Sequence, residues 1–207
     1  MKPIKKLYSK EKREIYLYQD YGEGKTVLII GVVHGEEFQG KTLLENYIPK
    51  SHKNNLLLIP CLNPDGLVKN QRQNSNGVDL NRNFPTKNWI KSEKNQYYGG
   101  ETPASEIETK FVIDIFEKYN PDIILTIHAP YKVVNYDGPA QIYAENISDI
   151  IGYKATNDIG YPTPGSMGNY FGVERNIPII TLELDEEEPI ENLQGKINNI
   201  IDYLANI

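Results

Sequence analysis

Four short segments of the chain are almost continuously apolar, which is typical of strands that are buried on both faces of a sheet. Each is six to eight residues long and rich in branched aliphatic side chains; they are residues 26–33, 55–62, 122–127 and 177–184. Runs of this kind, separated by helical patterns, predict the α/β class with a largely parallel or mixed sheet.

The helical patterns lie between and after these segments. In residues 104–119 apolar residues recur on one helix face, and Ser105 and Glu108 have the spacing of a capping box. Residues 190–204 form a second amphipathic stretch. Residues 84–102 are polar, aromatic and glycine-containing, and we expect them to form a long functional loop. Because no internal repeat or low-complexity linker interrupts the pattern, we expect residues 1–207 to form a single domain.

Composition and charge limit the kinds of molecule that we expect the protein to bind. The 207 residues include 22 Lys and Arg against 28 Asp and Glu, a formal net charge of −6, so we expect no general affinity for nucleic acid or anionic membranes. Cys61 is the only cysteine, so no intrachain disulfide is expected. The amino-terminal residues lack the apolar stretch of a secretory signal, and we expect a cytoplasmic protein. Both a monomer and a homodimer agree with the sequence.

Three of the four apolar segments end in a residue that can bind a metal or move a proton. His34 follows the first segment, His128 follows the third, and Glu183 lies at the end of the fourth. In open α/β sheets, functional sites gather at the carboxyl ends of the strands. The sequence therefore predicts a site at this edge of the sheet.

The two histidines and a nearby glutamate form a metal-ligand pattern. His34 and Glu37 are spaced His-x-x-Glu, and with His128 they make the two-His, one-Glu set of catalytic zinc sites, which leaves one position for water. Alone, His-x-x-Glu is usually solvated surface and a single histidine is usually a core residue. The chain has three histidines, however, and two of them close buried strands. The third, His52, lies in a polar stretch and is interpreted as a surface residue.

Glu183 lies between two leucines, where burial of an unpartnered carboxylate is costly. It either faces water on the polar side of an alternating strand, or it is a general base beside a metal-bound water in an environment that tunes its pKa.

The segment of residues 76–85 is dense in polar groups. Asp79 can accept a hydrogen bond from the non-ligating nitrogen of a metal-bound histidine. Arg82, with Asn81 beside it, offers a fork for a carboxylate, and Arg72 can face a developing oxyanion. Taken singly, each arginine is equally an ordinary surface residue.

Together these motifs resemble the zinc carboxypeptidase family, in the small bacterial branch of murein peptide amidases. The motifs that carry the resemblance occur in the family's order: His34-x-x-Glu37, Asn63-Pro64-Asp65-Gly66, residues 77–83, His128 and Glu183. Three further segments carry the resemblance to the branch: residues 128–130, 136–140 and 163–168.

The resemblance implies a fold, a cofactor and a set of roles. The fold is a three-layer α/β/α sandwich around a mixed, largely parallel sheet, and the cofactor is one zinc ion per chain. The implied roles are zinc ligation by His34, Glu37 and His128, proton transfer by Glu183, oxyanion stabilisation by Arg72, carboxylate binding by Asn81 and Arg82, a mobile tyrosine at Tyr161, and a specificity pocket near Met167.

The resemblance also implies a substrate, the amide bond between γ-D-glutamate and meso-diaminopimelate in small murein peptides. Asp137 suits the distant ammonium group of diaminopimelate, although an aspartate before Gly138 is also a common turn residue. Three alternatives stay open: a deacylase of N-acyl amino acids of the aspartoacylase or succinylglutamate desuccinylase type, a carboxypeptidase of α-linked peptides, and a non-catalytic zinc-containing module that binds muropeptides.

Overall fold

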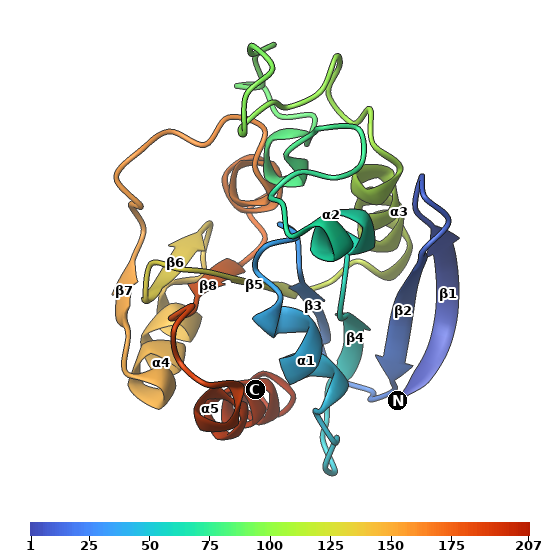
Figure 1. Cartoon of the computed structure of the whole chain (residues 1–207). Coiled ribbons are helices and arrows are strands. Elements are labelled where there is room, and N and C mark those ends of the chain that lie inside the picture. The colour runs from blue at the N-terminus through green and yellow to red at the C-terminus, as the bar shows by residue number, and fades with distance from the viewer.

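The computed structural model describes residues 1–207 as one sheet of eight strands with helices on both faces (Figure 1). The strands are β1 (Lys2–Tyr8), β2 (Glu14–Asp20), β3 (Thr26–Gly31), β4 (Asn55–Ile59), β5 (Ile123–His128), β6 (Val133–Asp137), β7 (Lys154–Thr156) and β8 (Ile179–Glu183). The helices are α1 (Gln39–Glu45), α2 (Pro64–Lys69), α3 (Ile107–Tyr119), α4 (Gln141–Ile151) and α5 (Ile190–Leu204), with short helical turns η1 (Leu80–Arg82) and η2 (Gly168–Val173).

The predicted strands form the centre of the sheet. The strand order is β1-β2-β4-β3-β5-β8-β6-β7, and the four neighbours β4, β3, β5 and β8 are parallel. On one side β2 joins β4 antiparallel and carries the β1–β2 hairpin, and on the other β6 joins β8 antiparallel. The predicted mixed, largely parallel sheet is confirmed. Because β3, β5 and β8 run in one direction, their carboxyl ends share one edge.

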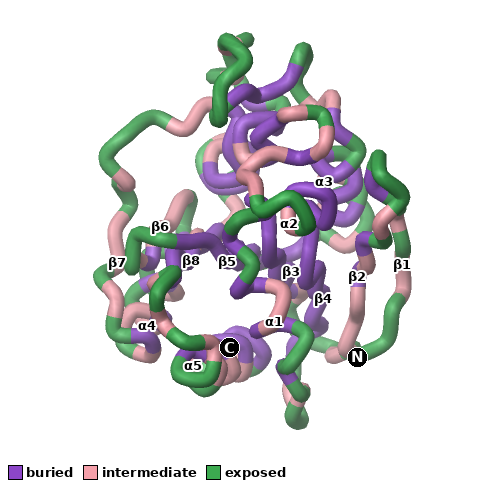
Figure 2. The backbone as a smooth tube through the Cα atoms, in the orientation of Figure 1, coloured by how far each residue is buried: buried purple, intermediate pink, exposed green.

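Two apolar layers hold the helices on the sheet. Helices α1, α4 and α5 pack on one face through a cluster that includes Ile147 and Ile197. Helix α3 and the turn η2 pack on the other through Phe111 and Phe171. Figure 2 shows the central strands buried between these layers. The three-layer α/β/α arrangement is therefore confirmed.

Two local predictions were wrong. Helix α3 begins at Ile107 and has no side-chain cap, because Ser105 Oγ donates to Glu106 Oε1 at 2.6 Å and the predicted capping box is not formed. The His52 side chain is only 6% exposed and bonds Asp20 Oδ2 at 3.0 Å and the Asn54 carbonyl oxygen at 2.8 Å, so it is not a surface residue.

Residues 83–106 cross the carboxyl edge of the sheet without a helix or strand, in agreement with the predicted long loop. None of the helices combines the length and the apolar character that crossing a membrane requires.

Candidate active site

The turn after β3 brings His34 and Glu37 to the edge of the sheet. Val32 has φ 49°, a left-handed conformation that is strained for a β-branched residue. At Gly35 a Cβ atom would lie 2.0 Å from the Gly66 carbonyl carbon, so only glycine fits there. Asn63 links the turn after β3 to helix α2. Its Nδ2 donates to the Val33 carbonyl at 3.3 Å, and its Oδ1 accepts from Gly66 N–H at 2.9 Å.

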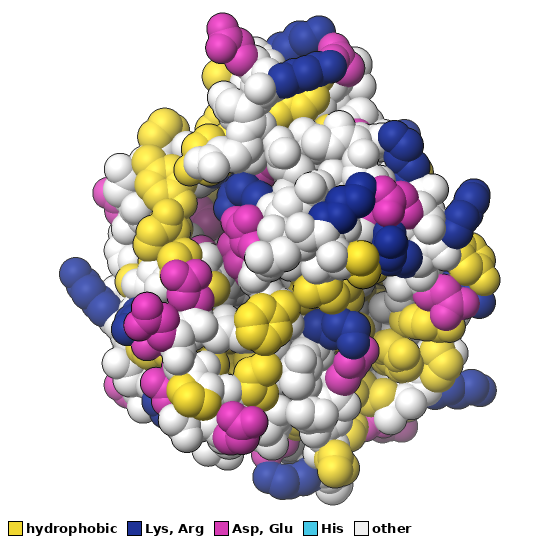
Figure 3. All heavy atoms as spheres, viewed as in Figure 1, with side chains coloured by type: hydrophobic (Ala, Val, Ile, Leu, Met, Phe, Trp, Pro, Cys, Tyr) yellow, Lys and Arg dark blue, Asp and Glu magenta, His cyan; other side chains and the backbone are white.

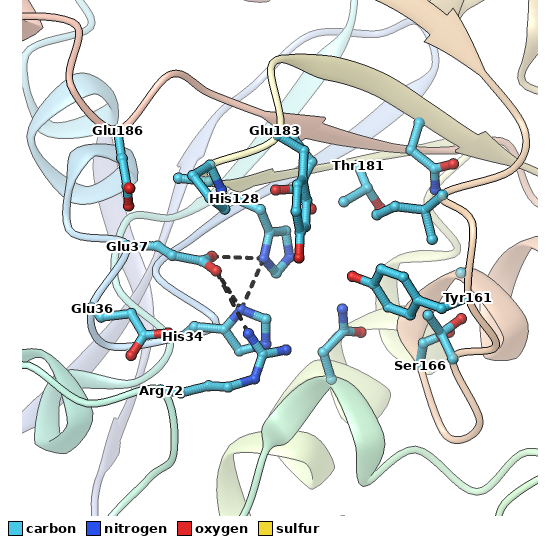
Figure 4. A pocket seen from close by; sticks show the side chains of 18 of the residues that line it. His34, Glu36, Glu37, Arg72, His128, Tyr161, Ser166, Thr181, Glu183 and Glu186 are labelled. Atoms are coloured by element: carbon cyan, nitrogen blue, oxygen red, sulfur yellow. Dashed lines mark hydrogen bonds and ion pairs between the residues drawn. The ribbon is translucent and has the colours of Figure 1, made fainter. Parts of the chain in front are cut away.

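His128 and Glu183 reach the same edge from β5 and β8, where they are partners in the strand register. His34, Glu37 and His128 are all buried, and their donor atoms lie within 4.8 Å of one another. His34 Nδ1 is 2.7 Å from Glu37 Oε1, His128 Nδ1 is 2.8 Å from Glu37 Oε2, and the two Nδ1 atoms are 3.2 Å apart. Figure 4 shows the three side chains converging in front of Glu183.

This donor set fits a metal ion. Ligands that lie 2.0–2.2 Å from a tetrahedral zinc ion are separated from one another by roughly 3.3 Å. The two Nδ1 atoms, 3.2 Å apart, are close to that value, whereas the nitrogen–oxygen separations of 2.7 and 2.8 Å are hydrogen-bond distances that a bound ion would lengthen. Both imidazoles direct Nδ1 at the same point beside the Glu37 carboxylate, and imidazole nitrogen and carboxylate oxygen are ligand types that zinc uses. Three protein ligands beside a cavity leave room for water, as catalytic zinc sites require.

The charges around the cluster favour an ionised Glu37. Burial raises the pKa of its carboxyl, but the neighbouring His34 and His128 outweigh burial and lower the pKa to about 2. Burial lowers the pKa of His34, but the negative charges of Glu37 and Asp79 outweigh burial and raise that pKa to about 9. These shifts pair a positively charged His34 imidazole with the Glu37 and Asp79 carboxylates.

Asp79 lies behind His34 and joins it to Arg72. Its side chain is fully buried; Oδ1 accepts from Asn81 N–H at 2.9 Å and lies 3.1 Å from His34 Nε2, while Oδ2 accepts from Arg72 Nε at 2.8 Å. The non-ligating nitrogen of His34 thus has the carboxylate partner that the sequence predicts. The same carboxylate fixes the direction of the Arg72 guanidinium.

The Glu183 carboxylate is buried, and one of its oxygens accepts no hydrogen bond. The residue is 6% exposed, and its Oε2 atom is buried without a hydrogen-bond partner. Burial, followed by the charge of Glu37, raises its pKa to about 8. Its position in a dry place beside the donor cluster matches the second of the two alternatives drawn from the sequence.

The cluster opens into a cavity of about 650 Å³. Of the substrate-facing residues expected from the sequence, five line it: Arg72, Asn81, Arg82, Asp137 and Tyr161. On the face drawn in Figure 3, basic and acidic side chains are interspersed without one continuous basic patch. The cavity lining itself contains two arginines together with several aspartates and glutamates, so it offers groups of both signs to a ligand.

The neighbours of Met167, Ser166 and Gly168, line the cavity as expected, but the Met167 side chain does not. This side chain is 2% exposed and packs into the core with Phe84 and Phe171. What Met167 contributes is its backbone N–H, which donates to Asn81 Oδ1 at 2.9 Å. This bond holds the Asn81 amide so that its NH₂ group stays available. Sequence position alone does not separate a side-chain contact from such a backbone contact.

Asn81 and Arg82 are held by contacts from several sides. Arg82 Nη1 donates to the Asn81 carbonyl at 2.7 Å, and the Tyr97 ring lies 5.9 Å from the Arg82 guanidinium carbon. Tyr161 is 43% exposed and packs edge-to-face on Tyr131, with ring centroids 6.4 Å apart. Burial, and then Tyr131, raise the pKa of the Tyr161 phenol to about 12, so the phenol stays protonated.

Asp137 lies on β6 and lines the cavity. A Cβ atom at Gly168 would lie 2.2 Å from Asp137 Oδ2, and one at Gly172 would lie 2.5 Å from Asp137 Cβ, so these two glycines leave the space that the side chain occupies. Burial alone raises its pKa, which means that no cation stabilises the carboxylate.

Sequence reasoning missed several residues that line the cavity, among them Glu36, Tyr131, Asn135, Thr181 and Glu186. Two of them carried a readable signal: Asn135 is two residues before Asp137, and Thr181 is two residues before Glu183. Side chains two apart on a strand share a face. The neighbours of a predicted site residue were therefore candidates as well.

Comparison with known proteins agrees with this geometry. The profile of the zinc carboxypeptidase family matches residues 4–143. Murein peptide amidase A of Vibrio campbellii is 30% identical over 174 residues, which are 76% of this chain and 68% of that protein. The Escherichia coli K12 protein of that name is 28% identical over 172 residues, 75% of this chain and 69% of its own length.

A solved structure gives the same fold. The crystal structure of the murein-tripeptide amidase from Escherichia coli O157 superposes with a TM-score of 0.85 at 23% identity, covering 99% of this chain and 93% of that one. The zinc ligation expected from the sequence has its donors in place, and the matched profile spans both histidines and the glutamate. This chain belongs to the zinc carboxypeptidase family, whose members are zinc hydrolases.

Proposed function

We propose that the chain hydrolyses the amide bond between γ-D-glutamate and meso-diaminopimelate in short murein peptides, with one zinc ion held by His34, Glu37 and His128. The observation that carries the hydrolytic part is the buried Glu183 carboxylate, which is opposite His128 in the strand register, lies beside the donors in Figure 4 and has one oxygen without a protein partner. The substrate rests on the murein peptide amidases, which share 28–30% identity over three quarters of the chain.

The bound zinc would supply a water of lowered pKa and polarise the amide carbonyl. The Glu183 carboxylate would accept a proton from that water and pass it to the departing amine nitrogen. Its high affinity for a proton suits it to hold the proton between the two steps. A cation at the donor cluster would lower the Glu183 pKa from the value in the metal-free chain, because an opposite charge favours the carboxylate.

Arg72 orients toward the cavity and stabilises the negative charge that develops on the carbonyl oxygen. Its direction is set by the Nε bond to Asp79, which leaves the terminal nitrogens free for the substrate, and Nη1 lies 3.9 Å from Glu37 Oε1. A donor that is fixed before the reaction needs no reorganisation when the charge appears.

Asn81 and Arg82 bind the carboxylate next to the scissile bond on the leaving side, and Asp137 binds the distal ammonium of diaminopimelate. A partly buried carboxylate without a cation is costly, and an ammonium group from the substrate would remove that cost. Tyr161 lies at the cavity wall opposite the donors, as Figure 4 shows, and would close over the bound peptide.

Mass spectrometry of the products tests this function. We expect L-Ala-γ-D-Glu-meso-diaminopimelate to yield L-Ala-D-Glu and free diaminopimelate, and a chelator to stop the reaction. N-succinylglutamate tests the deacylase alternative, and an α-linked dipeptide tests the ordinary carboxypeptidase. A module that only binds muropeptides would cleave none of the three. The cytoplasmic location and a role in peptidoglycan recycling stay predictions, which cell fractionation and analysis of accumulated peptides test.

A further inference from the structure

The inner wall of the cavity is made by the antiparallel pair β6 and β8. Asn135 and Asp137 are two residues apart on β6 and so project from one face. Asn135 is opposite Thr181 of β8 in the strand register, and all three residues line the cavity. Figure 4 shows Thr181 on the wall beyond Glu183, away from Arg72.

The polar groups on this wall lack partners. Asn135 Oδ1 is buried and has no hydrogen bond. The Asp137 carboxylate forms no hydrogen bond or ion pair, while the Thr181 hydroxyl has only a 3.4 Å contact with Thr126 Oγ1. Buried polar atoms in native proteins are nearly always satisfied. The unsatisfied Asn135 Oδ1 can only accept, so the partner that it lacks is a donor such as an ammonium group. The Asn135 Nδ2 group forms no hydrogen bond within the protein, and the Thr181 hydroxyl accepts from Thr126 Oγ1, so both keep a proton that they can donate to an anion.

The wall offers one anion beside two neutral groups that can donate. The Asp137 carboxylate accepts hydrogen bonds and attracts a cation, whereas the Asn135 amide and the Thr181 hydroxyl can both donate to an anion. A lysine-like side chain would use Asp137 alone. An amino-acid head group, with an ammonium and a carboxylate on one carbon, would use all three.

We infer that Asn135 and Thr181 bind the distal carboxylate of diaminopimelate while Asp137 binds the ammonium on the same carbon, so that the cavity selects diaminopimelate over lysine. This inference rests on the proposed function and adds to it the two residues that bind the distal carboxylate. The distal carboxylate is the group that distinguishes diaminopimelate from lysine, so a site that donates to it discriminates between the two.

The test compares L-Ala-γ-D-Glu-meso-diaminopimelate with L-Ala-γ-D-Glu-L-Lys in steady-state kinetics. Asn135→Ala should lower kcat/KM for the diaminopimelate peptide about 10- to 100-fold, the loss typical of one hydrogen bond to a charged group. The change should appear mainly in KM. The lysine peptide should change less than about threefold, because its side chain ends in the ammonium alone.

Further variants sharpen the test. Thr181→Val keeps the side-chain shape and should show the same selective loss, so the inference does not depend on the folding of one variant. Asn135→Asp places a second anion on the wall and should shift the preference toward the lysine peptide. Asn157→Ala is the matched control, because Asn157 also lines the cavity but is exposed; it should change neither substrate.

The outcomes separate the two proposals. If the wild-type chain cleaves neither γ-D-glutamyl peptide, the proposed function fails, and this inference fails with it. If the wild type cleaves the diaminopimelate peptide but Asn135→Ala and Thr181→Val change both substrates equally or not at all, this inference alone is overturned. Calorimetric binding of free meso-diaminopimelate against L-lysine should show the same selective loss in Asn135→Ala.

Discussion

Glu108 is a buried carboxylate on α3, and its replacement by glutamine should stabilise the protein in a pH-dependent way. The residue is 1% exposed, and its Oε2 accepts one hydrogen bond from Asn74 Nδ2 at 3.3 Å. Burial raises its pKa from the ordinary 4.5 to about 7. Between these two values the folded chain keeps a proton that the unfolded chain has lost, so stability falls as the pH rises from 4.5 to 7.

The size of the effect follows from the shift. At 1.36 kcal/mol per pKa unit, Glu108 costs the folded state about 1 kcal/mol at pH 5 and about 3 kcal/mol at pH 8. Glutamine has nearly the same shape and no charge to bury. Glu108→Gln should therefore exceed the wild type in unfolding free energy by these amounts, which urea titrations at several pH values measure.

A control on the same helix measures the effect of removing an exposed carboxylate. Glu117 lies on the same helix but is exposed, so Glu117→Gln should change the unfolding free energy by less than about 0.5 kcal/mol at either pH. Subtracting the unfolding free energy of the wild type from that of the variant removes the contribution of every other titrating group. A difference for Glu108→Gln that stays constant from pH 5 to pH 8 would refute the reasoning.

Three predictions concern the site. Glu183→Gln should keep zinc and abolish hydrolysis, measured by metal analysis and product assay; loss of zinc, or near-full activity, contradicts the assigned role. Arg72→Ala should lower kcat on the order of 10²–10³ with a smaller change in KM; an unchanged kcat removes Arg72 from the mechanism. Asp137→Ala should raise KM for the tripeptide while Asp158→Ala, at an exposed position of the same cavity, leaves it unchanged; an unaltered KM in Asp137→Ala rules out the ammonium contact.

The centre of the sheet could be predicted from the sequence because its strands are buried on both faces. The strands of residues 26–31 and 123–128 contain almost only apolar side chains and leave few alternatives to a buried strand. The edge hairpin β1–β2 escaped prediction because β1 is exposed and rich in lysine, which is how edge strands commonly avoid aggregation.

The site residues also divide into those that the sequence predicts and those that it does not. His34, His128 and Glu183 could be located because each ends a strand whose direction the class of fold fixes. The two-residue spacing from Asp137 and Glu183 makes Asn135 and Thr181 candidates, but their position opposite each other could not be predicted, because the β6–β8 register is a tertiary property. For Met167 the sequence indicated the right segment, because Ser166 and Gly168 line the cavity, but Met167 itself contributes its backbone N–H and not its side chain.

The central claim is that three side chains distant in sequence, His34, Glu37 and His128, hold one zinc ion. Calorimetric titration of the metal-free chain with zinc tests it most directly. We predict one high-affinity ion per wild-type chain and loss of that binding step in His128→Ala. A wild-type chain that binds no zinc, or a His128→Ala chain that binds one ion with unchanged affinity, would contradict the account.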